Sequence, residues 1–289
     1  MARTPPSQIS STTEPRAVRI MLIALAILLL TIFLILPLVL IFVSALAEGF
    51  GAYVHEVLDD RTWSAIRLTL ITAAIAVPLN TLFGVAAAWC VTKFDFRGKS
   101  LLATLIDLPF SVSPVVAGLC LLLVFGKRGW FGPVLERLDV PVIFAVPGIV
   151  LATVFITFPF VARELIPLME AQGTDEEQAA RVLGAGGWQT FWHVTLPNIK
   201  WGLLYGVILC NARAMGEFGA VYVVSTNQAD QITLPLHVQR VYYATYVRVV
   251  PVFAVASLLA FLAVVTLIVK TFVEWRFRHD VKRDDADTE

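Results

Sequence analysis

The sequence is poor in charged residues. Asp, Glu, Lys and Arg make up 15% of its 289 residues, whereas soluble domains have about 25%. Apolar residues make up 58%, and the mean hydropathy is +0.78. Lipid rather than water must therefore surround most of the chain. Because backbone groups in lipid must be satisfied within each span, we expect an all-α, polytopic membrane protein.

The sequence also has few cysteines and no net charge. Its three cysteines, Cys90, Cys120 and Cys210, all lie in apolar segments. An odd number of cysteines in apolar surroundings argues against a disulfide framework, and no two have the spacing of metal ligands. We expect them to pack as small apolar side chains, and we expect neither a metal site nor a nucleic-acid partner.

The sequence also lacks motifs for nucleotide binding and for catalysis. Gly98, Lys99 and Ser100 imitate the end of a phosphate-binding P-loop, but that motif requires a glycine where this chain has Lys93. The four histidines are scattered along the chain and form no catalytic cluster. The sequence therefore predicts a chain with no catalytic site and no bound cofactor of its own.

What the sequence has instead is long apolar runs. A membrane-spanning helix needs about 20 mostly apolar residues. Six segments qualify, at residues 20–47, 64–92, 100–125, 142–161, 201–225 and 249–273. Several of them contain proline, which membrane helices tolerate better than soluble helices do.

The N-terminus offers two interpretations. Residues 1–18 are rich in Ser, Thr and Pro and are expected to be disordered. Ser44 to Ala47 imitate a signal-peptidase site, but a signal peptide has an apolar region of about 7–15 residues. The run at 20–47 is far longer, so we expect a retained helix that begins a transmembrane domain at 19–275, with a cleaved signal as the alternative.

The distribution of Lys and Arg predicts the orientation. The N-terminus, the loop 93–99, the segment 162–200 and the C-terminal tail, assigned to 276–289, carry about twice as many basic residues as the other connections. Cytoplasmic connections carry the excess of basic residues. Both termini and the segment 162–200 are therefore expected in the cytoplasm.

The segment 174–197 is polar, glycine-rich and aromatic, unlike the spans on either side of it. Thr174 followed by Glu177 predicts a capping box at a helix start. Gly184 stands where a left-handed residue would end that helix. Trp188, Phe191 and Trp192 then have the spacing of one helical face. Two short helices joined by a glycine turn are expected on the cytoplasmic surface.

Leu196 and Pro197 are expected to end the second of these helices before the next span. Physical reasoning leaves two roles open for the helix pair. It could lie on lipid headgroups with its aromatic side chains as anchors, or it could dock onto a cytoplasmic protein.

The spacing of this segment resembles the EAA loop of bacterial ABC-importer permeases, E-A-A-x3-G-x9-I-x-L-P. The matching positions are Gln178, Ala179, Ala180, Gly184, Val194, Leu196 and Pro197. Gln178 departs from the family glutamate and Val194 from the family isoleucine. The first departure removes a charge, and with it any salt bridge made from that position.

In that family the loop forms a coupling helix that sits in a groove of a separate ATPase, which binds ATP and Mg. The resemblance therefore implies an ATPase-coupling site in this chain. Its residues would be Gln178, Ala179, Ala180, Leu183, Gly184, Ala185, Trp188, Phe191, Leu196 and Pro197.

The fifth span carries an ionic pair. Arg213 and Glu217 lie four residues apart, on a face that also carries glycines, and a charge at membrane depth normally faces protein or water. We favour a structural ion pair that locks this helix to its neighbours. The alternative is that Arg213 faces an aqueous cavity and attracts an anion.

The third span is interrupted by Pro109 and Pro114. Ser111 and Ser113 could hydrogen-bond the carbonyls that the prolines free, or the broken helix could offer N–H donors to a passing oxyanion. Asp107 would repel an anion, so we expect it to have a partner on another helix.

Three stretches resemble the sulfate/molybdate branch of ABC permeases, and within it the CysW-type family of sulfate/thiosulfate importers. They are LPFSVSPVVAG at 108–118, FPFVARELIPLME at 158–170 and NARAMGEFGAV at 211–221. The resemblance implies the type I permease fold with six transmembrane helices, in the inner membrane of a bacterium.

The same resemblance implies alternating access driven by a cytoplasmic ATPase dimer, a second homologous permease subunit and an extracytoplasmic sulfate-binding protein. A homodimer remains the alternative to a heterodimer, and molybdate, tungstate or another oxyanion the alternative substrate. A secondary transporter and an intramembrane enzyme are less favoured, because we find no internal repeat and no catalytic dyad.

Overall fold

The structure is a computed structural model that describes residues 16–225, 231–244 and 250–286, with side chains described as far as Phe272. Within these ranges the chain forms helices and no strand, as the all-α prediction requires. The expected disordered segment falls outside the described residues up to residue 15, and residues 16–18 are the first of helix α1.

The first span is a single helical run made of α1 (Arg16–Leu30), the π-helical turn η1 (Thr31–Ile35) and α2 (Leu36–Ala45). Pro37 is the second residue after the π turn. Proline lacks an N–H donor and its ring crowds the preceding turn, and the wider π turn relieves that crowding. The helix therefore continues through the proline.

The same arrangement recurs at the end of the polar segment. The π turn η2 (Phe191–Thr195) joins α10 (Gly187–Thr190) to α11 (Leu196–Met215) without a break. The prediction that Leu196 and Pro197 end a helix was wrong, because the π turn absorbs the proline here too.

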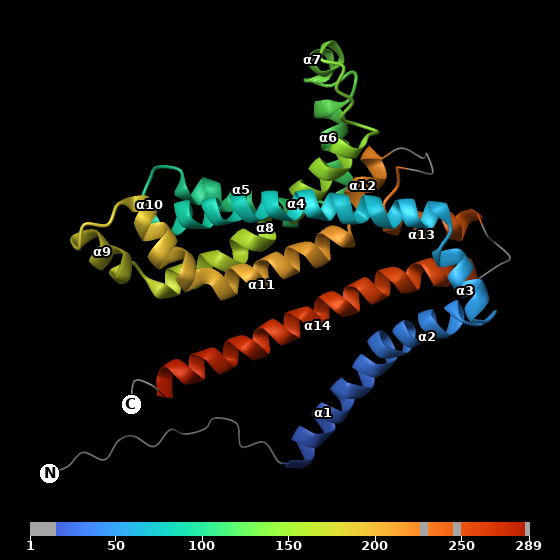
Figure 1. The fold of residues 1–289 in the computed structure, drawn as a ribbon, viewed down its shortest axis with the longest axis horizontal. Helices are drawn as coiled ribbons and strands as arrows, with labels where there is room; N and C mark the ends of the chain where they lie inside the picture. Colours follow the sequence, from blue (N-terminus) through green and yellow to red (C-terminus); the bar gives the residue numbers. More distant parts are fainter. Residues whose placement is uncertain (1–15, 226–230, 245–249, 287–289) are drawn as a thin grey trace.

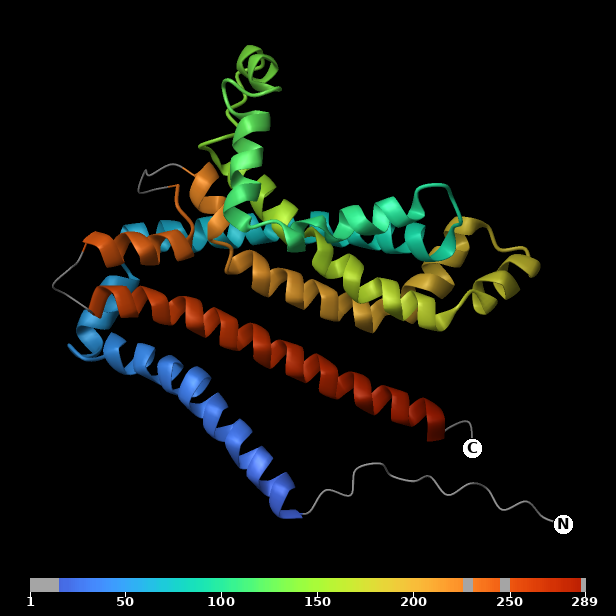
Figure 2. The same ribbon diagram turned by 180° about the vertical axis from the view of Figure 1, so that it is seen from behind.

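Three long helices, α4 (Asp60–Lys93), α8 (Val146–Gln172) and α11, pack side by side and form the centre of the molecule (Figures 1 and 2). Asp59 caps α4 by accepting a hydrogen bond from the Arg61 N–H at 3.2 Å. Their shared core is largely apolar and contains a buried link in which Asn80 Nδ2 donates to Thr157 Oγ1 at 2.6 Å.

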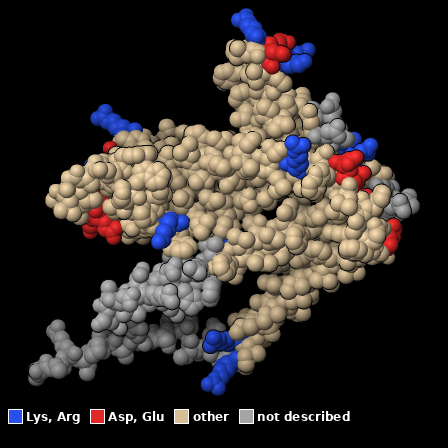
Figure 3. All heavy atoms as spheres, in the orientation of Figure 1, with Lys and Arg blue, Asp and Glu red and all other residues tan. Residues whose placement is uncertain are grey.

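The long helix α14 (Val250–Ala286) lies between this centre and α2 (Figure 1). The short helices α3 (Phe50–Val57) and α13 (Leu234–Ala244) lie together at one end of the bundle (Figure 1). The polar segment lies at the opposite end. Charged side chains on the face in Figure 3 gather mostly toward the ends of the bundle, which leaves wide uncharged areas for lipid.

The third span is not one helix. α5 (Lys99–Ser111) and α6 (Pro114–Phe125) meet at an angle of 111°. A residue before proline avoids the helical region, and Ser113 is accordingly extended, with φ −57° and ψ 135°. α6 and the short helix α7 (Gly132–Arg137) consequently project away from the bundle (Figure 1).

The fifth expected span is also broken, since α11 ends at Met215 and α12 (Gly219–Val224) begins after three intervening residues. The prediction of one continuous helical face through residues 201–225 was therefore wrong. Within the described residues, four helices are long and apolar enough to cross a membrane, or five if the bent pair α5–α6 counts as one.

The boundaries of the polar segment also differ from the prediction. α8 runs on to Gln172, well past the expected span end at residue 161. The loop therefore begins at Gly173, and the two ends of the segment 162–200 belong to the long helices α8 and α11.

Candidate coupling site

The candidate site is the helix pair between α8 and α11, at one end of the bundle (Figure 1). α9 (Asp175–Val182) and α10 meet at a glycine turn, as predicted. Gly184 has φ +92°, the left-handed conformation that only glycine adopts without strain. The Gly186 N–H donates to Gln189 Oε1 at 2.9 Å and so starts α10.

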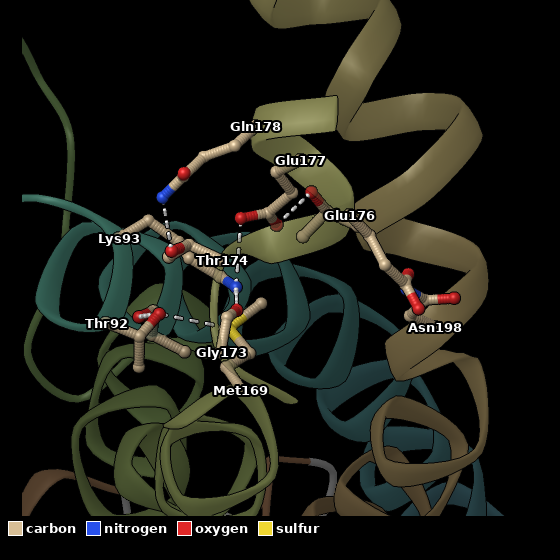
Figure 4. Close-up of polar contacts among 11 residues, drawn as sticks. Thr92, Lys93, Met169, Gly173, Thr174, Glu176, Glu177, Gln178 and Asn198 are labelled. Atoms are coloured by element: carbon tan, nitrogen blue, oxygen red, sulfur yellow. Dashed lines mark hydrogen bonds and ion pairs between the residues drawn. The ribbon is translucent and has the colours of Figure 1, made fainter. Parts of the chain in front are cut away.

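A buried ion pair joins α9 to the end of α4. Lys93 Nζ lies 3.0 Å from Glu177 Oε2, with side chains only 8% and 15% exposed (Figure 4). Lys93 also donates to the Gly173 carbonyl at 2.5 Å, and Glu177 Oε1 accepts from Thr195 Oγ1 at 2.7 Å. One carboxylate therefore connects α4, α9 and the start of the α11 helix.

These contacts correct the capping-box prediction. Glu177 turns to Lys93, and the Thr174 hydroxyl accepts a hydrogen bond from Gln178 Nε2 at 2.8 Å instead of capping the helix (Figure 4). A charge-assisted bond to an ammonium is stronger than a bond to a neutral backbone N–H. The tertiary partner therefore overrides the local motif.

A second set of contacts joins α9 to α11. Asn198 Nδ2 donates to Glu176 Oε2, and Gln172 Nε2 donates to the Asn198 carbonyl at 3.0 Å. We call the residues that fix the helix pair to the bundle the base: Lys93, Glu176, Glu177, Thr195 and Asn198. None of these contacts was predicted, because their partners lie far apart in the sequence.

The predicted aromatic face is present. The Trp188 ring lies 5.8 Å from that of Phe191 and 5.7 Å from that of Trp192. Phe191 also packs against Trp89 of α4, with ring centroids 5.0 Å apart. Phe191 is thus held by the bundle, while Trp188 is mostly exposed.

The far end of the helix pair exposes apolar side chains. Val182 and Leu183 are 87% and 88% exposed, at the glycine turn between α9 and α10. Together with Trp188 they form a surface that we call the tip. Burying a side chain of this size is worth about 1.5–3 kcal/mol, so the tip is poised for a partner.

The remaining predicted coupling residues lie around the tip. Gln178, Ala179 and Gly184 are exposed, and Ala180 and Ala185 are half-buried. Leu196 and Pro197 lie at the start of α11, beside the base rather than at the tip. The structure thus separates the predicted set into an outward part and an anchoring part.

The predicted pair in the fifth span is formed. Arg213 Nη2 lies 2.9 Å from Glu217 Oε2, and the Glu217 side chain is 1% exposed. Its other oxygen accepts a hydrogen bond from the Ala220 N–H at 3.0 Å, which caps α12. Glu217 therefore holds a helix break together, a role that the continuous-helix prediction missed.

Ser111 and Ser113 lie exposed at the break between α5 and α6. Neither hydroxyl makes a hydrogen bond within the described residues, so the predicted bonding to freed carbonyls is not seen there. The predicted partner of Asp107 is present, since Arg163 Nε of α8 lies 3.1 Å from Asp107 Oδ1.

The polar loop, the broken spans and the helix bundle correspond to a known family of transport proteins. Residues 80–279 match the family described as binding-protein-dependent transport system inner membrane component. The chain belongs to this family. Membership confirms the resemblance to ABC permeases that the loop motif carried.

Relatives within this family extend over nearly the whole chain. The sulfate transport system permease protein CysW of Synechocystis is 49% identical, covering 91% of this chain and 95% of that protein. CysW of Escherichia coli K12 is 46% identical, covering 91% and 90%. CysT of the same strain is 33% identical, covering 84% and 89%.

A chain of a bacterial alginate ABC transporter, solved in complex with a periplasmic protein bound to an alginate pentasaccharide, has a similar fold. The TM-score is 0.73 over 92% of this chain and 96% of that one, at 18% sequence identity. At this identity the likeness concerns the fold alone, and it agrees with the expected permease fold.

Proposed function

We propose that this chain is a permease subunit of an ABC importer that carries sulfate or thiosulfate into the cytoplasm. The observation that carries the proposal is an apolar tip, fixed to the ends of α4 and α11 by the base, with its mostly buried ion pair between Lys93 and Glu177. A separate cytoplasmic ATPase dimer would bind ATP and Mg and cover the tip. This chain itself would contribute no catalytic group.

The base explains how closure of the ATPase dimer would be transmitted to the membrane helices α4 and α11. Lys93 and Glu177 are bound to each other by a charge-assisted bond, and Glu176 to Asn198 by another. The helix pair therefore cannot shift without moving α4 and α11. Alternating access follows if those helices line the inner gate.

Six spans with both termini in the cytoplasm are part of the proposal, and the placement of the helix ends fits an even number of spans. α1 begins and α14 ends away from the α3–α13 end of the bundle, on the side of α9 (Figures 1 and 2). In this topology a reporter fused at Gly187 faces the cytoplasm and one fused at Asp59 faces outside. A reporter at Gly187 that faces outside would contradict both the orientation and the coupling role.

Similarity to both CysW and CysT of one organism favours a second, homologous permease subunit over a homodimer. Sulfate is the favoured substrate because the similar permeases carry that name, and molybdate remains the alternative. An extracytoplasmic binding protein would deliver the anion.

The test is transport by the purified complex in proteoliposomes. The chain should co-purify with a soluble ATPase, and radiolabelled sulfate should enter the vesicles only with ATP and the binding protein. Thiosulfate should compete for uptake. ATP-dependent uptake of molybdate without sulfate would assign the other substrate, and uptake driven by an ion gradient would contradict the ABC mechanism.

A further inference from the structure

Helix α5 has three different faces. Ile106 and Pro109 are buried against the bundle. Leu101, Leu105 and Leu108 are exposed on another side. An exposed face of leucines on a membrane helix suits lipid, as expected of a helix at the edge of one subunit.

The third face of α5 is polar. Ser100, Thr104, Asp107 and Ser111 recur at intervals of four, three and four residues, which places them along one line of a helix. Ser100, Thr104 and Ser111 are exposed, and the Asp107 side chain is 50% exposed. We call this line the polar stripe. It runs from the start of α5 to the break before α6.

Arg163 of α8 contacts the polar stripe at Asp107. Its Nε is 3.1 Å from Asp107 Oδ1, and its guanidinium carbon lies 5.0 Å from the centre of the Phe110 ring. The side chain is still 57% exposed. Its two terminal amino groups donate no hydrogen bond within the described residues, although a guanidinium can donate five.

The depth of this ion pair makes its exposure informative. Asp107 lies eight residues after Lys99, at which α5 begins, so it is about 12 Å along the helix at about 1.5 Å per residue. The hydrocarbon core is about 30 Å thick. Charged groups at such a depth face protein or water and not lipid.

The other intramembrane pair is less exposed, since Arg213 is 35% exposed and Glu217 only 1%. Glu217 is buried and its second oxygen is already engaged by the Ala220 N–H. Asp107 and Arg163 are both half-exposed, and the exposed side of Arg163 carries unused donors. Arg163 therefore presents more exposed hydrogen-bond donors than Arg213, whose carboxylate partner is buried and caps α12.

We propose that the polar stripe lines the route of the transported anion, and that Arg163 donates hydrogen bonds to a tetrahedral, divalent oxyanion on its way inward. Terminal amino groups of arginine match such oxygens in a forked geometry. Asp107 holds the guanidinium in place and offsets part of its charge, which keeps binding weak enough for release. The proposal rests on the proposed transport function.

The first test measures access to water on neighbouring residues of α5. In a variant without Cys90, Cys120 and Cys210 that still takes up sulfate, Thr104→Cys should react with a negatively charged sulfonate thiol reagent in membranes. Leu105→Cys, one residue further on the leucine face, is the matched control and should not react. Equal reaction at both positions, or none at Thr104→Cys, would overturn the route.

The second test separates anion contact from structure. The double variant Arg163→Met with Asp107→Asn removes both charges, so no buried charge is left alone. The reconstituted complex should assemble and hydrolyse ATP, while sulfate uptake falls about tenfold or more, the loss expected for a charge-assisted hydrogen bond. Asp107→Asn alone keeps the arginine but removes the charge that offsets it, so the KM for sulfate should fall together with the maximal rate of uptake.

Normal sulfate uptake by the double variant would overturn the role of Arg163. Failure of the unchanged complex to take up sulfate would instead contradict the proposed function, so the two failures are distinguishable. If the double variant does not assemble, Arg163→Lys decides, because it keeps the charge but loses the fork. It should raise the KM for sulfate, and an unchanged KM would overturn the contact.

Discussion

The base and the tip of the coupling helix pair differ in the burial and the chemistry of their side chains. At the base, the charged side chains have partners, and those of Lys93 and Glu177 are mostly buried as well. At the tip, apolar residues such as Leu183 are almost fully exposed. Buried, paired charges fix a position, whereas exposed apolar groups are stable only when another surface covers them. The side chains on the membrane side of the segment therefore have their partners within the chain, whereas the apolar side chains on its outer side await a partner from another molecule.

The largest effect is expected from breaking the base. Lys93→Met leaves Glu177 mostly buried without a counter-charge, and breaking a buried pair costs about 3–5 kcal/mol. ATP hydrolysis should persist while sulfate uptake in proteoliposomes is lost, because the tip no longer moves with α4. The charge exchange Lys93→Glu with Glu177→Lys should restore part of the uptake.

The control for this prediction is Lys99→Met. Lys99 pairs with Asp95 at 3.2 Å on the surface near by, and exposed pairs contribute about 0.2–1 kcal/mol. Its uptake should stay close to normal. Equal losses from Lys93→Met and Lys99→Met would mean that the base has no special role.

Breaking the pair of Arg213 and Glu217 should also destabilise the protein, but it should not affect the contact with the ATPase. Arg213→Met leaves Glu217 alone in the membrane, again at about 3–5 kcal/mol, toward the lower value because Arg213 itself is partly exposed. The yield of assembled complex should fall. Adding Glu217→Gln should recover it, since the amide oxygen still caps Ala220. An Arg213→Met complex that assembles fully but takes up no sulfate, without rescue in the double variant, would favour anion contact.

A smaller effect is expected from charging the tip. Leu183→Glu removes burial worth about 1.5–3 kcal/mol on docking, which corresponds to about 10-fold to 100-fold weaker binding of the ATPase. Co-purification should drop while insertion into the membrane persists. Leu138→Glu, at the exposed leucine directly after α7, is the matched control and should leave ATPase binding intact.

The smallest effect is expected at the glycine turn. Gly184 has φ +92°, and a Cβ there would meet no atom within 4 Å. Gly184→Ala should therefore cost only backbone strain of about 1–2 kcal/mol, read as a lower melting temperature of the complex with ATPase binding retained. Gly184→Glu adds a charged side chain beside the tip and should weaken ATPase binding as well. Unchanged binding and uptake in Gly184→Glu would argue against docking at this turn.

Local chemistry was readable from the sequence. The glycine at the turn, the aromatic face of Trp188, and the pairing of Arg213 with Glu217 each depend on residues within four positions of one another. Fixed helical geometry makes such neighbours predictable. The need of Asp107 for a partner was also predictable, because a charge at membrane depth requires one.

Contacts between distant segments were not readable in this way. Lys93 and Glu177 lie on different helices, and the capping motif offered Glu177 a local partner that the fold does not use. Hydropathy indicated one span at residues 100–125, because it measures how apolar a segment is and not the direction in which its helices run. The bend before Pro114 was expected only as an interruption, and its angle depends on how α6 and α12 pack.

The most direct test of the coupling role is photo-crosslinking from the tip in native membranes. A photoreactive amino acid at position 183 should form an adduct with the ATPase subunit, and one at position 138 should not. Adducts at position 183 with lipid alone would show that the helix pair lies on the membrane, and would contradict docking of the tip onto an ATPase.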